Sequence, residues 1–167
     1  MGMFNLENHF YFDTEIGTIR IAENGTAITE VRFCKQPYTK QQTCKTPLLK
    51  EAFVQLNEYF TGTRTEFHLP LAPQGTPFQQ AVWETLCTIP YGETRSYLQI
   101  AQLIGNPKAC RAVGMANHKN PIGIIIPCHR VIGKNGKLTG YAGGLDKKEN
   151  LLLLEQRHRK NKEGNKC

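Results

Sequence analysis

The chain has 167 residues, of which 40% are hydrophobic and 21% charged, with a formal net charge of +7, which is typical of a globular protein with one domain or two small ones. No apolar run approaches the ~18 residues that a transmembrane helix needs, and the N-terminus lacks the basic-then-apolar pattern of a signal peptide. We therefore predict a cytoplasmic protein that makes no use of a membrane.

The first half of the chain predicts a small α/β unit. Three β-favouring runs predict strands, at residues 9–15, 18–23 and 27–33. Asn24-Gly25 predicts a hairpin turn, because both residues tolerate positive φ. After a polar loop at 35–46, apolar residues recur at helical spacing over 48–60, and Gly62 ends that helix. No group of residues in this half suggests chemistry.

The stretch PLAPQGTP at 70–77 is a linker by composition, and we place a domain boundary there. Beyond it the sequence predicts three short helices, at residues 78–87, 96–104 and 108–117. The last two are joined by a turn containing Gly105 and so predict a helix-turn-helix unit, a pattern that many helical hairpins share. The last helix carries several small residues, which indicate either close packing or close approach to a nucleic acid.

Positive charge is concentrated in the second half. Residues 77–157 carry ten Lys and Arg against five Asp and Glu, and residues 158–167 carry four against one. Residues 1–76 carry seven against eight. The basic half predicts a polyanion as partner, with a solvated basic surface as the alternative.

The six cysteines are scattered along the chain, at Cys34, Cys44, Cys87, Cys110, Cys128 and Cys167. No CxxC pair occurs, so the spacing supports neither a zinc ribbon nor a thioredoxin-type redox pair. In a reducing compartment we expect free thiols, most of them small apolar fillers.

Cys128 differs from the others because it lies in the stretch PCHRVIG at 127–133, directly after the apolar run 122–126. That run predicts a strand or an extended segment buried on both faces, so Cys128 and His129 follow the point where a buried element leaves the core. A nearby imidazole can activate a thiol, but adjacent side chains point in different directions, so we expect a water bridge or a sharp turn.

Glu155 is the candidate to orient His129, because it lies in the helical stretch KKENLLLLEQ, whose apolar residues predict burial. The alternative is a structural salt bridge between Glu155 and a Lys or Arg. Between these segments lies the glycine-rich loop 133–144, which either approaches a planar ligand closely or is a flexible surface loop.

Four segments together resemble the O6-alkylguanine-DNA alkyltransferase family of suicide DNA-repair proteins. They are PCHRVIG, GYAGG at 140–144, GNPKACRAVGMANHKNP at 105–121 and YGETRSY at 91–97. The resemblance covers the second half in family order, whereas the first half fits by size and strand–helix order alone. It implies an N-terminal α/β domain of ribonuclease H-like fold, followed by a mainly α domain with a winged-helix-like helix-turn-helix.

The resemblance also implies a catalytic set. Cys128 would take the alkyl group from guanine O6 in one irreversible step, His129 would deprotonate it through a water, and Glu155 would orient His129. Asn120 would hold the neighbouring turn and assist the thiolate; its alternative role is that of an Asn-Pro turn residue.

The DNA- and base-binding residues that the resemblance implies are Tyr97, Ala109, Arg111, Gly114, Arg130, Tyr141, Ala142 and Gly143. Tyr97 would donate a hydrogen bond to the flipped base, and residues 141–143 would line its pocket. Arg111 would fill the vacated place in the base stack, because O6 is reached only after base flipping. The helix at 108–117 would enter the minor groove of double-stranded DNA.

The sequence departs from the family pattern in two places. Ala142 stands where vertebrate members have a serine, which leaves the alkyl preference open. Activity on O4-alkylthymine is open as well. Some members bind zinc in the N-terminal domain, but no such ligand set is recognisable, so we predict no metal and no cofactor. The predicted units are an N-terminal domain at 1–73, a catalytic DNA-binding domain at 77–157 and a basic tail at 158–167, in a monomer.

Three alternatives make different predictions. An alkyltransferase-like protein that binds lesions without repair usually has tryptophan in place of the reactive cysteine, and Cys128 argues against it. A helix-turn-helix regulator would bind one DNA sequence without needing Cys128. A cysteine hydrolase would turn over many substrate molecules, whereas an alkyltransferase reacts once.

Overall fold

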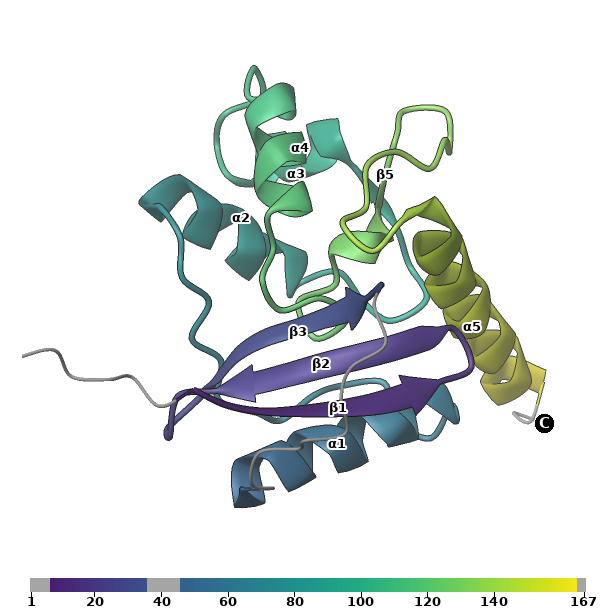
Figure 1. Cartoon of the computed structure of the whole chain (residues 1–167). Coiled ribbons are helices and arrows are strands. Elements are labelled where there is room, and N and C mark those ends of the chain that lie inside the picture. The colour runs from purple at the N-terminus through teal and green to yellow at the C-terminus, as the bar shows by residue number, and fades with distance from the viewer. Residues whose placement is uncertain (1–6, 36–45, 165–167) are drawn as a thin grey trace, which may run out of the picture.

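The computed structural model describes residues 7–35 and 46–164. The chain begins with an antiparallel sheet in the order β1-β2-β3 (Figure 1), formed by β1 (Asn8–Thr14), β2 (Gly17–Glu23) and β3 (Ile28–Cys34). The three strands and the hairpin after β2 confirm the sequence prediction. Gly25 has a φ of +99°, and the Asn24 side chain accepts a hydrogen bond from the Ala27 amide at 3.0 Å. Most of the predicted loop 35–46, together with Cys44 and Cys167, lies outside the described residues.

Helix α1 (Pro47–Phe60) packs against β1 and β2. Its start is fixed by Thr46, whose side chain accepts a hydrogen bond from the Leu49 amide, and by Pro47 at the first helical position. Its buried face includes Leu56 and Tyr59, which are fully inaccessible to solvent. The chain leaves the helix at Gly62, whose φ of +83° confirms the predicted stop.

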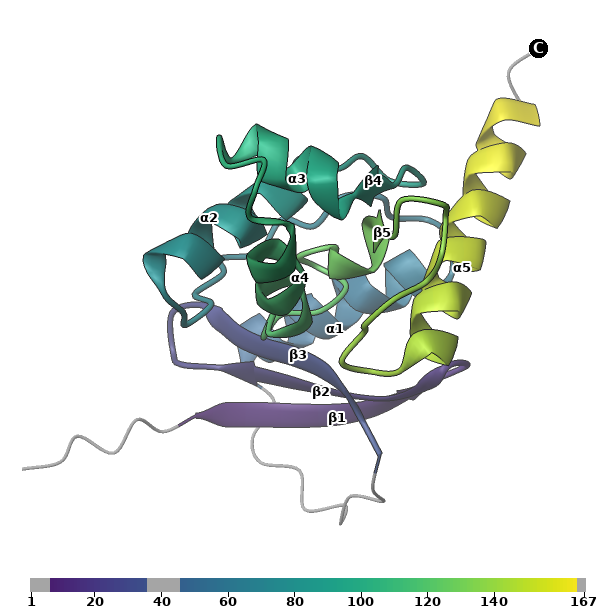
Figure 2. The same cartoon turned by 90° about the horizontal axis from the view of Figure 1, so that it is seen from above.

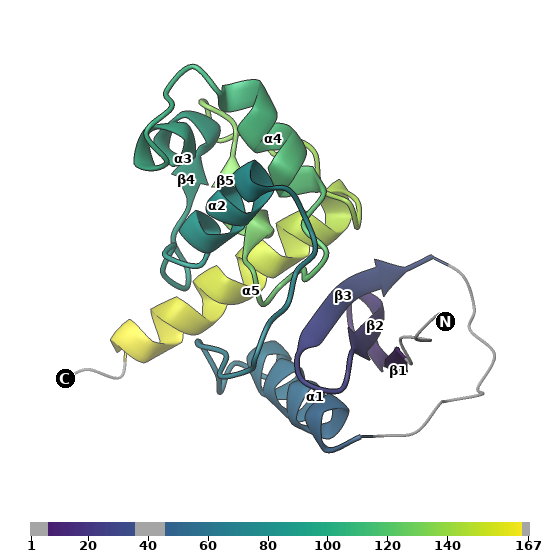
Figure 3. The ribbon, with the colours of Figure 1, turned by 90° about the vertical axis from the view of Figure 1, so that its left-hand side faces the viewer.

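The second half is mainly helical and packs beside the sheet (Figures 2 and 3). It contains α2 (Pro77–Leu86), α3 (Tyr97–Leu103) and α4 (Cys110–His118). Thr76 and Ser96 form capping boxes at the starts of α2 and α3. The indole N–H of Trp83 on α2 donates to the Ala116 carbonyl on α4 at 2.8 Å. Helix α2 therefore packs against the helix-turn-helix and stabilises it.

The reactive stretch lies between this helical layer and the last helix, α5 (Leu145–Gly164). A 3₁₀ turn, η1, spans Cys128–Arg130 and continues into the two-residue strand β5 (Val131–Ile132), which pairs in parallel with β4 (Arg95–Ser96). Helix α5 packs against η1 and continues through residues 158–164 of the predicted basic tail. No helix in the described part of the chain combines the length and apolarity needed to span a membrane.

The prediction of a buried strand at 122–126 is wrong. Only Ile122 bridges to a strand, at Val31 of β3, where the Val31 amide donates to the Pro121 carbonyl at 3.0 Å. The chain then turns at Ile124, which has a φ of +70°. The isoleucine side chains of residues 122–126 are buried as predicted, but a short apolar run fits a compact turn as well as a strand. After this turn, Cys128 lines a cavity together with residues of β3, where the two halves of the chain meet.

Candidate active site

The η1 turn directs the Cys128 side chain away from those of His129 and Arg130. Cys128 is 4% exposed and lines a cavity, whereas His129 and Arg130 both contact Glu155 on α5. A strand would have alternated these side chains across its two faces, but a tight turn spreads them around its axis. The local geometry therefore separates the thiol from the imidazole, in agreement with the predicted awkwardness of a direct contact.

His129 and Glu155 form a buried pair. The Nε2 atom of His129 lies 2.5 Å from Oε2 of Glu155, and the two side chains are 0% and 1% exposed. A carboxylate only accepts hydrogen bonds, so Nε2 carries the proton and Nδ1 is the basic nitrogen. That Nδ1 atom is buried and has no hydrogen-bond partner among the described residues. Burial lowers the pKa of His129, against the opposing effect of Glu155, so the imidazole is held neutral and able to accept a proton.

The Glu155 carboxylate accepts hydrogen bonds from four residues that lie outside α5. The His129 ring and the Tyr59 hydroxyl bind Oε2, the latter at 2.6 Å. The Gly92 amide binds Oε1 at 3.0 Å, and the Arg130 guanidinium binds both oxygens, at 2.8 and 3.1 Å. Burial alone would raise the pKa of this carboxyl, but His129 and Arg130 hold it well below its usual range. Glu155 therefore stays ionised.

The Arg130 side chain points inward, toward Glu155. Its guanidinium is occupied by Glu155 and by the Ile89 carbonyl, at 2.7 Å, and the residue is 6% exposed. Its Cζ atom also lies 5.6 Å from the ring centroid of Tyr91. The assignment of Arg130 to DNA or base binding stays a prediction, and the contacts of its guanidinium favour a role as the ion-pair partner of Glu155. A buried carboxylate needs a buried cation, and that requirement fixes the side chain inward.

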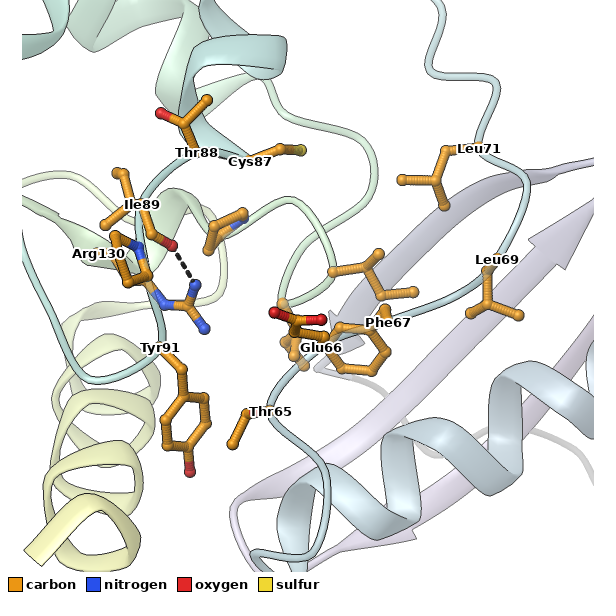
Figure 4. Close-up of a pocket in the computed structure, with 14 residues that line it drawn as sticks. Thr65, Glu66, Phe67, Leu69, Leu71, Cys87, Thr88, Ile89, Tyr91 and Arg130 are labelled. Carbon is orange, nitrogen blue, oxygen red and sulfur yellow. Dashed lines mark hydrogen bonds between the residues drawn. The ribbon is translucent and has the colours of Figure 1, made fainter. Parts of the chain in front are cut away.

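Arg130 lines a different cavity from the one that contains Cys128. This cavity, of about 450 Å³, opens between residues 65–71 and residues 87–91 (Figure 4). Its walls combine apolar side chains with polar ones such as Glu66 and Arg130, and Figure 4 shows the guanidinium of Arg130 beside the Ile89 carbonyl. The cavity therefore lies at the Arg130 side of the His129–Glu155 pair and does not include the thiol.

The surroundings of Cys128 combine an apolar wall with a few polar groups. Burial raises the pKa of the Cys128 thiol, while Asn120 and the ammonium of Lys148 oppose that rise. The amide of Asn120 donates to the Ile126 carbonyl at 2.8 Å, and its oxygen accepts from the Ile122 amide at 3.0 Å. Asn120 therefore holds the turn before Cys128 and also acts on the thiol, so both roles weighed for it are compatible with the geometry.

Cys128 opens into a cavity of about 200 Å³ whose walls come from three parts of the chain. Among them are Tyr141, Ala142 and Gly143 of the glycine-rich loop, as the resemblance implied, and Asn120 beside the thiol. Val31, Arg32 and Phe33 of β3 complete the wall, so the N-terminal sheet contributes to this site. The small volume and the planar ring of Tyr141 favour a small flat ligand.

Tyr97 and Arg111 do not line this cavity. The Tyr97 hydroxyl donates to the Thr139 carbonyl at 3.1 Å, and the Tyr97 ring lies beside Gly114. Arg111 is exposed on α4, Ala109 precedes that helix as its N-cap, and Gly114 faces α3. The small residue Ala116 of α4 is buried against α2, which is close packing, whereas Arg111 on the same helix lies on the surface.

Sequence reasoning missed three buried polar residues around this site. Lys148 is fully buried, donates to the Thr139 carbonyl at 2.8 Å, and has its pKa lowered by burial to about 8. Asn117 donates to the Cys128 carbonyl at 3.2 Å, and Tyr59 binds Glu155. Of these three residues, only Lys148 has a sequence signal for burial, because it precedes the apolar run 151–154 of the same helix.

No cluster of three His, Cys, Asp or Glu side chains suited to a metal ion occurs within residues 7–35 and 46–164. The predictions of no metal and no cofactor stay predictions.

Comparison with known proteins identifies both halves of the chain. Residues 9–73 match the ribonuclease-like domain of 6-O-methylguanine DNA methyltransferase, and residues 77–157 match the DNA-binding domain of the same family. The first of these matches and the observed sheet and helices confirm the predicted fold class.

Individual relatives are similar over nearly their whole length. A methylated-DNA--protein-cysteine methyltransferase of Mycobacterium bovis is 53% identical over 147 residues, which cover 86% of this chain and 89% of the relative. Its counterpart in Methanosarcina barkeri is 51% identical, with 87% and 97% covered. The solved structure of Mycobacterium tuberculosis OGT in complex with DNA is 50% identical, with a TM-score of 0.83 over 90% of this chain and 94% of that one.

Proposed function

This chain belongs to the 6-O-methylguanine DNA methyltransferase family, and from that premise we propose that it moves the alkyl group of O6-alkylguanine in duplex DNA to its own Cys128. DNA repair by alkyl transfer to a cysteine is the activity of this enzyme. The observation that carries the choice of Cys128 is its position in the wall of a small cavity, next in sequence to the histidine of a buried His–Glu pair.

The proposed chemistry is one displacement. The Cys128 thiol passes its proton through a water to Nδ1 of His129, and the resulting imidazolium is stabilised by Glu155. The thiolate attacks the alkyl carbon, the carbon–O6 bond breaks, and a thioether forms. Guanine leaves as an anion, to which the Tyr97 hydroxyl is the proposed hydrogen-bond donor. The anion takes up one proton from water, and His129 returns the thiol proton to water. Nothing regenerates the thiol, so the protein acts once.

The proposed DNA complex has α4 in the minor groove and the alkylated base extruded into the Cys128 cavity. The exposed position of Arg111 on α4 supports this orientation, as does the concentration of positive charge in the second half. Ala109 and Gly114 would allow the helix to approach the groove, and Tyr141, Ala142 and Gly143 would enclose the base. Monomeric action and a cytoplasmic location are part of the same proposal.

The assignment of the nucleophile is tested with Cys128→Ala. We expect this variant to bind lesion-containing duplex with close to wild-type affinity and to return no guanine, because binding does not need the thiol. Cys110→Ala, which removes a half-buried thiol on α4, is the matched control and should repair normally. Repair by Cys128→Ala would refute the assignment.

The role of Arg111 is tested by comparing two substrates. Extruding a base costs a few kcal/mol of stacking and pairing, and a planar guanidinium recovers part of that when it fills the gap. At saturating DNA, Arg111→Ala should therefore slow repair in duplex far more than reaction with free O6-benzylguanine, which needs no extrusion. Equal slowing on both substrates would assign Arg111 to the fold or the pocket.

A further inference from the structure

The N-terminal domain contributes a side chain directly to the proton relay. Tyr59 on α1 donates its hydroxyl to Oε2 of Glu155 at 2.6 Å, across 96 positions of sequence. This is the same carboxylate oxygen that accepts from His129. We propose that Tyr59 is a positioning residue for alkyl transfer, which acts by fixing and partly neutralising the Glu155 oxygen that His129 uses.

The contact is permanent over the working pH range. Tyr59 is 0% exposed, and burial raises its pKa well above the ordinary tyrosine value, with Glu155 adding to the rise. The hydroxyl therefore remains a donor at every pH at which the protein works. Its ring is also held from the side, with edge contacts to Phe60 and Tyr91 at centroid distances of 5.4 and 6.1 Å. A side chain locked in this way can fix the group to which it donates.

The electrostatic effect has a definite sign. Tyr59 and His129 compete for the charge on one oxygen, so the tyrosine hydrogen bond reduces how far Glu155 stabilises the imidazolium. Removal of the hydroxyl leaves more charge on that oxygen and raises the pKa of His129. The base must be neutral to accept the thiol proton, so the acid side of the rate profile should move to higher pH.

The inference rests on the relay proposed above, and Tyr59→Phe tests it because only the hydroxyl is lost. At saturating DNA we expect the maximal single-turnover rate to fall by roughly tenfold, the effect of one hydrogen bond to a charged group, with DNA affinity unchanged. The matched control is Tyr91→Phe. The Tyr91 hydroxyl is buried in the same cluster, but it has no hydrogen-bond partner among the described residues, so its loss should leave rate and pH profile unchanged.

A double-variant comparison separates positioning from general support of the fold. In a Glu155→Gln background the relay is already interrupted, so Tyr59→Phe should slow transfer by less than about twofold more. A purely structural role would slow both backgrounds equally and leave the pH profile in place, which would overturn the inference. If the double variant does not fold, the pH profile of Tyr59→Phe against Tyr91→Phe decides alone.

The two proposals fail in different ways. If Glu155→Gln transfers the alkyl group at the wild-type rate, the relay itself is wrong. If Glu155→Gln is slow but Tyr59→Phe matches the wild type in rate and profile, only the role of Tyr59 is refuted.

Discussion

Glu155→Gln is expected to slow alkyl transfer by ~10²–10⁴ while leaving DNA affinity close to that of the wild type, as for removal of other base-orienting groups. Among residues 7–35 and 46–164, the Glu155 carboxylate is the only group that binds Nε2 of His129, so its loss removes both the orientation of the ring and the charge that stabilises the imidazolium. DNA affinity should persist because Glu155 is 1% exposed and lies away from the surface of α4.

The variant must be compared under conditions in which it is folded. In Glu155→Gln the buried guanidinium of Arg130 would lose its negatively charged partner, which should lower the free energy of unfolding by about 3 kcal/mol. Rates are therefore measured at a temperature at which circular dichroism shows both proteins to be native. Unchanged single-turnover rates would reduce Glu155 to a structural ion-pair partner of Arg130, the alternative that the sequence left open.

Lys148→Met is expected to slow alkyl transfer about tenfold or more without loss of stability. The Lys148 ammonium opposes the rise in the pKa of Cys128, and each unit of that pKa corresponds to a tenfold change in thiolate fraction. Because Lys148 is a buried cation without a salt bridge to any residue that the structure describes, an apolar side chain of similar length should fold at least as well. Denaturant unfolding and single-turnover kinetics on the same samples check both statements.

The pH profile gives this prediction a second measurement. The pKa of Lys148 is lowered to about 8, so the ammonium is present below that pH and is lost as pH rises through it. In the wild type, the stabilisation of the Cys128 thiolate by Lys148 should therefore be lost above about pH 8. The pH profile of the transfer rate of Lys148→Met should show no such change. Lys147→Met removes a charge of the same sign at the neighbouring, less buried position and serves as the control. A control as slow as Lys148→Met would indicate a general charge effect on DNA binding.

The secondary structure and the reactive stretch were predictable because their signals are local. Asn24-Gly25 encodes its own turn, and Cys128, His129 and Arg130 are adjacent in the sequence. Glu155 was predictable in kind, since a carboxylate in an apolar helix needs a partner. The sequence posed a choice between His129 and a cation for that partner, and the structure has both, through the two carboxylate oxygens.

The remaining parts depend on contacts that no local pattern encodes. Tyr59 contacts Glu155 only once the two halves of the chain have packed together. In the sequence, its position in α1 is typical of an ordinary core residue. The inward direction of Arg130 follows from the η1 turn, which replaced the expected strand exit. The role of Lys148 became visible only when its burial and its hydrogen bond to the Thr139 carbonyl were known.

Intact-mass spectrometry with excess lesion tests the central claim most directly. Wild-type protein is incubated with a severalfold excess of duplex containing O6-methylguanine, and both protein mass and repaired DNA are counted. We predict a single gain of about 14 Da per molecule, located by fragmentation at Cys128, and one guanine restored for each protein consumed. Repair of many lesions per molecule with no change in protein mass, or methyl groups found on another cysteine, would contradict the account.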